Sequence, residues 1–190
     1  KMSAAVPDTR VDEFRERVSA DAIAIVNSEF PAKIDSLGNI VQVIEAELAR
    51  ADTVPADASV ADLARKHVPC NPAILRVFTE LKRELLDLSD KLDTLRVWIR
   101  LHAPRIEEGN NFGVAVQEEI LAMLRSGQAS AFTLLEVAAK YFMRRARRIT
   151  KAQKEHMVED WAELIRDMDE KQLASLRQTL TDLRYTYVIL

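Results

Sequence analysis

Apolar residues recur at helical spacing along four long stretches of the chain. In residues 72–103 they step alternately by four and three positions, which predicts a long helix that packs one seam against partner helices. The seam consists of Ile74, Phe78, Leu81, Leu85, Leu88, Leu92, Leu95, Ile99 and His102. The histidine in the last slot is expected to face the core or an interface. Because proline disfavours helix in the residue before it, Pro104 should end this helix.

The second half of the chain predicts two more helices, over residues 112–150 and 158–190. The first has a stripe formed by Val116, Ile120, Met123, Leu124, Leu134, Leu135, Ala138, Phe142 and Ile149. Gly127 lies inside it and weakens the helix without obviously ending it. Residues 151–157 are interpreted as a short connection between the two helices.

The N-terminal stretch, residues 8–50, carries two apolar stripes separated by Pro31. Proline inside a helix removes a hydrogen bond and clashes with the preceding turn, so Pro31 should kink or divide this helix. The proline-containing segment 51–71 is the one credible long linker. Long helices joined by two tight connections and one longer one predict a single all-α domain, residues 1–190, folded as an antiparallel four-helix bundle.

Composition supports this fold and argues against several classes of function. The chain has 4 glycines and 6 prolines in 190 residues, and its formal net charge of −3 argues against a nucleic-acid partner. The lone cysteine, Cys70, excludes an internal disulfide framework and fits a reducing compartment. No apolar run approaches the ~18 residues of a membrane span, and the first residues lack a signal core. We therefore expect a soluble protein of the cytoplasm, with the nucleus as the alternative, and no membrane partner.

Residues that could carry catalysis or bind metal are not grouped in the sequence. The histidines, His67, His102 and His156, lie far apart, and none belongs to a Glu-x-x-His pair. Zinc-binding spacings, phosphate-binding glycine motifs and the nucleophile elbow are also missing. We expect no catalytic residue, no metal and no cofactor, which favours a regulator or a structural protein over an enzyme.

One cluster of basic residues stands out, in "RRARRITKAQK". It contains Arg144, Arg145, Arg147, Arg148 and Lys151. Cations near the C-terminal end of a helix are favoured by the helix dipole, so a solvated helix end is one interpretation. A channel lining, a subunit contact and an acidic partner are the alternatives.

The segment between the second and third helices, residues 104–113, is short, acidic and rich in glycine and asparagine. Its candidate contact residues are Arg105, Ile106, Glu107, Glu108, Gly109, Asn110, Asn111, Phe112 and Gly113. A plain connection, in which asparagine and glycine absorb left-handed backbone, is one interpretation. The segment is longer than a bundle turn needs, however, and a rigid loop at the end of a bundle suits contact with a partner.

These residues resemble a known family. "PRIEEGNNFGVAVQEE" (residues 104–119) is similar to the activation-loop region of the REG-type (11S) proteasome activators. Weaker similarities follow the family's order, in "VDEFRER", "FPAKI", "HMVEDW" and "DEKQLASLR". The resemblance implies a subunit of a heptameric ring that caps the proteasome core particle without ATP. It also implies activation loops that contact the core's α subunits and open their gate, while the activator itself cleaves nothing.

The resemblance also suggests individual roles within the segment. Glu108, with Asn110 or Asn111, would contact the gate or fix the loop, and Arg105, Glu107 and Phe112 would support it. Family chains continue beyond a stretch like "LRYTYVIL" into a docking tail, so no tail residue is assigned here. A helical-bundle adaptor or scaffold that keeps the fold without opening the gate is the alternative function. Homomeric and mixed rings are both compatible with the sequence.

Overall fold

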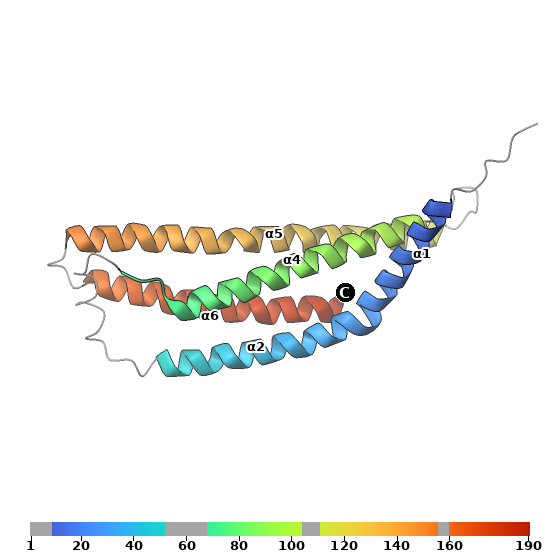
Figure 1. The fold of residues 1–190 in the computed structure, drawn as a ribbon. Coiled ribbons are helices and arrows are strands. Elements are labelled where there is room, and N and C mark those ends of the chain that lie inside the picture. Colours follow the sequence, from blue (N-terminus) through green and yellow to red (C-terminus); the bar gives the residue numbers. More distant parts are fainter. Residues whose placement is uncertain (1–8, 52–67, 104–110, 156–159) are drawn as a thin grey trace, which may run out of the picture.

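The computed structural model describes residues 9–51, 68–103, 111–155 and 160–190. The helices are α1 (Thr9–Ala24), the π-helix η1 (Ile25–Glu29), α2 (Phe30–Ala51), α4 (Pro72–Leu101), α5 (Asn111–Lys154) and α6 (Asp160–Ile189). The described ranges contain no strand. Figure 1 shows α1, η1 and α2 as one bent unit and the four long units side by side in alternating directions. The predicted all-α, antiparallel four-helix bundle is confirmed.

The N-terminal unit bends just before Pro31, as its sequence predicts. The N–H of Phe30 donates to the carbonyl of Ile25, which is the wide hydrogen bond of a π-helix. Pro31 has no N–H to continue the α-helical ladder from α2 back into this turn. The bend directs α1 across α4, whereas α2 packs mainly along α6 (Figure 1).

The core lies on the predicted seam of α4. Its eight apolar members, from Ile74 to Ile99, are all buried. They meet a matching stripe on α6 formed by Leu173, Leu176, Leu180, Leu183 and Tyr187. Leu37 and Ile44 add the buried face of α2. Full burial of such a side chain contributes roughly 2 kcal/mol, so this seam contributes strongly to stability.

Two details of the predicted helices are corrected by the structure. His102 does not face the core of its own chain and is exposed there, because α4 ends at Leu101 and His102 leaves helical geometry at φ −104° and ψ 8°. On α5, Val116, Ile120 and Met123 are exposed, although the apolar spacing assigns them to the stripe. Leu124, another member of the predicted stripe, is buried, and Ala131 and Tyr141, which the stripe did not include, are buried as well.

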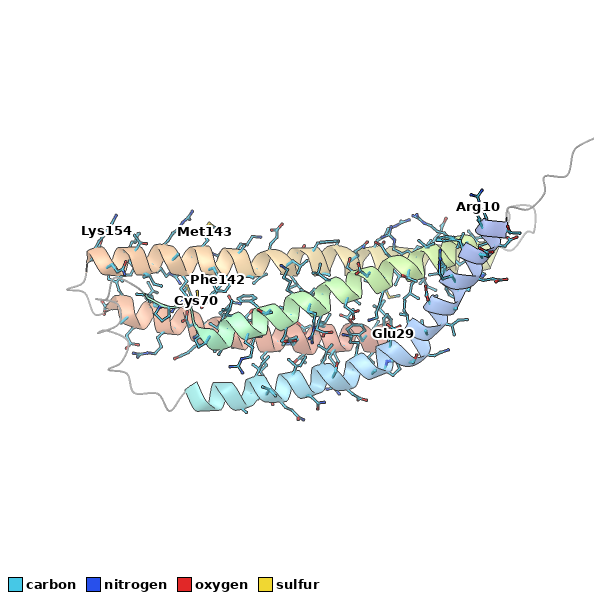
Figure 2. All side chains as sticks on the ribbon, viewed as in Figure 1. Arg10, Glu29, Cys70, Phe142, Met143 and Lys154 are labelled. Atoms are coloured by element: carbon cyan, nitrogen blue, oxygen red, sulfur yellow. The ribbon has the colours of Figure 1, made fainter. Side chains whose placement is uncertain are left out.

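The helix α5 also runs further than expected and passes very close to α4. It continues through Lys154, since no proline or glycine interrupts residues 151–154. A Cβ added at Gly127 would lie 3.3 Å from Cδ1 of Leu92, so a glycine lets the two helices approach. Figure 2 shows Phe142 and Met143 in the part of α5 that leads to Lys154, where Phe142 packs on Phe78 and Met143 is exposed.

Candidate functional site

The predicted contact segment, residues 104–113, joins α4 to α5 at one end of the bundle (Figure 1). Arg105, Ile106, Glu107, Glu108, Gly109 and Asn110 lie outside the described residues. Asn111 is the first residue of α5, and Phe112 and Gly113 follow it within the first turn. The described part of the predicted segment is therefore helical.

Both flanks of this segment are tied to one another. The imidazole Nδ1 of His102 lies 2.8 Å from the carbonyl oxygen of Trp98, and the two rings contact each other at a tilt of 49° with centroids 5.2 Å apart. The side-chain amide of Gln117 donates to the carbonyl oxygen of His102 at 3.4 Å. Trp98 itself packs against the core. The point where the chain leaves α4 is thus fixed to the second turn of α5.

Sequence analysis did not assign Trp98 or Gln117 to this site. A signal for Trp98 was available, because it precedes His102 by one helical turn and side chains with that spacing share a face. Gln117 carried no comparable signal, since its partner is a backbone carbonyl.

The predicted basic cluster divides over different faces of α5. Arg145 points into the bundle, where its Nε donates to both carboxylate oxygens of Asp169 at 3.1 Å. Arg147 and Lys151 are exposed to solvent. Arg144 and Arg148 line a groove between α5 and α6. The five residues therefore do not form one surface.

Asp169 is the centre of a polar cluster at the start of α4, which we call the Asp169 cluster (Asn71, Tyr141, Arg145 and Asp169). Besides Arg145, its carboxylate accepts hydrogen bonds from the hydroxyl of Tyr141 at 2.8 Å and from Nδ2 of Asn71 at 3.4 Å. Burial, together with the bond to Asp169, raises the pKa of Tyr141 well above its ordinary value. The cluster joins α4, α5 and α6.

The Asp169 cluster also fixes the start of α4. The side-chain oxygen of Asn71 caps the helix by accepting from the N–H groups of Ala73 and Ile74 at 3.1 and 3.3 Å. Arg145 donates its Nη1 to the carbonyl oxygen of Pro69 at 3.1 Å. These bonds give Arg145 a structural role.

A second polar cluster lies beside the bend, and we call it the bend cluster (Lys33, Glu84, Asp87, Lys91 and Tyr187). Glu84 is only 2% exposed and accepts from Nζ of Lys33 at 2.6 Å. Lys33 also lies 3.1 Å from Asp87, which accepts a hydrogen bond from Lys91. Within the described part of the chain, the buried hydroxyl of Tyr187 has no hydrogen-bond partner.

Charges in the bend cluster shift one another's protonation. Burial alone would lower the pKa of Lys33, but hydrogen bonds and charges from Glu84 and Asp87 raise it above its ordinary value. Burial alone would raise the pKa of Asp87, but Lys91 and Lys33 hold it below its ordinary value. The pKa of Tyr187 is raised by burial and by the nearby carboxylates. The ion pairs of the cluster hold α2 against α4.

The described ranges contain neither a candidate metal site nor a helix suited to span a membrane. No group of three or more histidine, cysteine, aspartate or glutamate side chains there is arranged to hold a metal ion. None of the helices there combines the length and the apolar character that crossing a bilayer requires.

Comparison with known proteins extends the resemblance to nearly the whole chain. The family described as "Proteasome activator PA28, C-terminal" matches residues 67–190, and "Proteasome activator PA28, N-terminal" matches residues 7–60. Proteasome activator complex subunit 3 of Homo sapiens is 28% identical, in an alignment that covers 95% of this chain and 86% of that protein. The Gallus gallus protein of the same name is equally similar.

A solved structure supports the same relationship. The structure described as the 11S subunit of the Plasmodium falciparum proteasome, PA28, superposes with a TM-score of 0.78 at 27% identity. The alignment covers 100% of this chain and 92% of that one. With its four-helix fold and both family matches in order along the sequence, the chain belongs to the PA28 family, the REG-type or 11S proteasome activators.

Proposed function

We propose that this chain is a subunit of an ATP-independent activator of the proteasome and that it cleaves no peptide itself. The observation that carries the proposal is that both PA28 family regions match this chain, over residues 7–60 and 67–190. The chain also shares its fold with a solved PA28 subunit. Activation of the proteasome is what the names of its relatives state. The proposed location is the cytoplasm, with the nucleus as the alternative.

The proposed assembly is a heptameric ring. A lone subunit leaves large apolar side chains exposed on the first half of α5, at Val116, Ile120, Met123 and Phe132. Exposed apolar surface of this kind favours contact with another protein surface. Copies of the same chain, packed around a ring, would cover it.

The proposed contact with the core particle is the segment 104–113. It would touch the α subunits and hold their gate open, with Glu108 and Asn110 or Asn111 as the main contact or loop-fixing residues. The ties between Trp98, His102 and Gln117 support this role, because they fix the residues on both sides of the segment. Seven copies on one ring would multiply a weak contact through avidity.

The proposal is tested by the hydrolysis of short fluorogenic peptides. Purified proteasome core is assayed without ATP, alone and with this protein, and beside a version of the chain extended by the C-terminal tail of a relative. We expect faster hydrolysis with the extended chain at least, and no hydrolysis when the core is omitted. If both versions form folded rings and neither stimulates the core, the adaptor or scaffold function replaces the proposed one.

A further inference from the structure

A groove between α5 and α6 lies towards the end of α5 that is remote from residues 104–113. It encloses about 410 Å³. Its apolar lining includes Val137, Leu164 and Met168, with the buried Tyr141 beside them. Four basic side chains, Lys140, Arg144, Arg148 and Lys171, surround this lining, together with one carboxylate, Asp167, which pairs with Lys171. The groove therefore combines an apolar floor with a positively charged rim.

The four basic residues differ in what they contact. Lys140 pairs with Glu136 and Lys171 with Asp167, each at 2.8 Å. Arg144 and Arg148 have no carboxylate partner anywhere in the described ranges. Their neighbour Arg145 is directed into the bundle and satisfied by Asp169. Two guanidinium groups on one side of the groove are thus available to a ligand.

The spacing of these two arginines suits an extended acidic peptide. They are one helical turn apart on α5, so their Cβ atoms lie about 5–6 Å from each other. Alternate side chains on one face of an extended peptide repeat every ~7 Å, which long arginine side chains can match. The side chains between them would point to the other face. An apolar side chain at the end of such a peptide could lie on the groove floor.

The surroundings of Arg148 strengthen such contacts. It is half-buried, beside an apolar lining that displaces water. Hydrogen bonds between guanidinium and carboxylate groups are stronger than neutral ones, and they strengthen further as water is excluded. A fully solvated charged face would lack this effect.

The chemistry of the groove favours an acidic peptide over a second copy of the chain or a nucleic acid. The interior of an interface between copies is depleted in charge. Four exposed large apolar residues, Val116, Ile120, Met123 and Phe132, lie on the first half of α5, away from this groove, whereas the groove itself is rich in charged side chains. Single-stranded nucleic acid needs exposed aromatic rings for stacking, whereas Tyr141 is buried.

We propose that the α5–α6 groove binds an acidic, extended peptide segment of a partner protein, with Arg144 and Arg148 as its carboxylate-binding residues. The site is separate from residues 104–113 and acts at the other end of the bundle. It is independent of the proposed activation of the proteasome.

The test is direct binding of a short fluorescent peptide of alternating glutamate and leucine to the 190-residue protein, followed by fluorescence anisotropy. A peptide with glutamine in place of glutamate serves as the ligand control. The protein variants are Arg144→Glu and Arg148→Glu, with Arg147→Glu as the matched control for the same charge change outside the groove lining. Circular dichroism and sedimentation establish that each variant keeps its fold and its particle size.

We expect the glutamate peptide to bind and its glutamine counterpart to bind at least tenfold more weakly. Each groove variant should weaken binding by roughly tenfold, and Arg147→Glu by less than about threefold. Equal losses in all three variants would show an unspecific effect of charge and overturn the proposal. Absence of peptide binding, tighter binding of an oligouridine RNA, or dissociation of the assembly by the groove variants alone would overturn it as well.

Discussion

The two polar clusters of the bundle both pair polar side chains between packed helices, but the pairs are arranged differently. In the Asp169 cluster one carboxylate accepts hydrogen bonds from three side chains, which come from α5 and from the residue that caps α4. In the bend cluster two lysines pair with two carboxylates, and the hydroxyl of Tyr187 has no partner among the described residues. The first cluster depends on a single group. The second is redundant, so the loss of one member leaves other pairs in place.

The largest predicted effect comes from Asp169→Ala. The substitution leaves the guanidinium of Arg145, which is 12% exposed, and the hydroxyl of Tyr141 without their shared acceptor. Removing one partner of a buried pair should lower the free energy of unfolding by about 3 kcal/mol. Urea unfolding at a fixed protein concentration, followed by circular dichroism, measures this.

The control is Asp167→Ala. This substitution removes an exposed carboxylate that pairs with Lys171, one helical turn further along α6. It should change the free energy of unfolding by less than about 0.5 kcal/mol. Equal losses for the two aspartate variants would contradict the central place of Asp169.

Glu84→Ala should have the next largest effect, about 2 kcal/mol. Glu84 is more deeply buried than Asp169, but its partner Lys33 keeps Asp87 at 3.1 Å. The same unfolding assay applies. The double variant Lys33→Met with Glu84→Leu replaces the pair by apolar side chains and should lie within about 1 kcal/mol of the wild type. A loss for Glu84→Ala greater than that for Asp169→Ala would show that the bend cluster is not redundant.

A pair of tyrosine variants sharpens the comparison. Tyr141→Phe removes a hydroxyl that donates to Asp169 and should lower the free energy of unfolding by about 1 kcal/mol. Tyr187→Phe removes a buried hydroxyl without a partner in the described ranges, so it should be neutral or slightly stabilising. Both variants keep the ring, including the contact of Tyr187 with Phe30 at 5.1 Å between centroids. A larger loss of unfolding free energy for Tyr187→Phe than for Tyr141→Phe would contradict this prediction.

The smallest predicted effect is a pH dependence that arises from Asp87. Its pKa in the folded protein lies below the ordinary value of 3.8, so its contribution to stability is present above that pH. The contribution is lost as the pH falls through the folded pKa. The stability difference between wild type and Asp87→Asn should therefore shrink in acid below about pH 4, as urea unfolding at several pH values would show. A difference that stays constant into strong acid would argue against this ion pair.

The fold was predictable because the α4 seam is long and regular. Its eight apolar positions repeat over four heptads, and all are buried. Pro31 identified the bend for a local reason, the missing N–H. On α5 the same reasoning failed for Val116, Ile120 and Met123, because a helix with apolar residues on two sides does not reveal which side packs within its own subunit.

The polar clusters could not be predicted, because their members are far apart in the sequence. Tyr141, Arg145 and Asp169 meet only after α5 and α6 have packed. The helix-capping role of Asn71 is the exception, since an asparagine before a proline at a helix start is a recognised capping signal. The bond of Asn71 to Asp169 has no such signal. The contact role of residues 104–113 was predicted from the resemblance of their sequence to a family, and it stays a prediction.

The most direct test of the proposed activator function compares how the variant Asn111→Tyr and the wild type stimulate the proteasome core. Both proteins carry the C-terminal tail of a relative, as in the assay proposed above. Asn111 begins α5 at the edge of the proposed contact segment, so a bulky ring there should change the segment without unfolding a helix of 44 residues. We predict a particle of unchanged size that no longer accelerates the hydrolysis of fluorogenic peptides. Stimulation equal to that of the wild type would contradict the proposed role of residues 104–113.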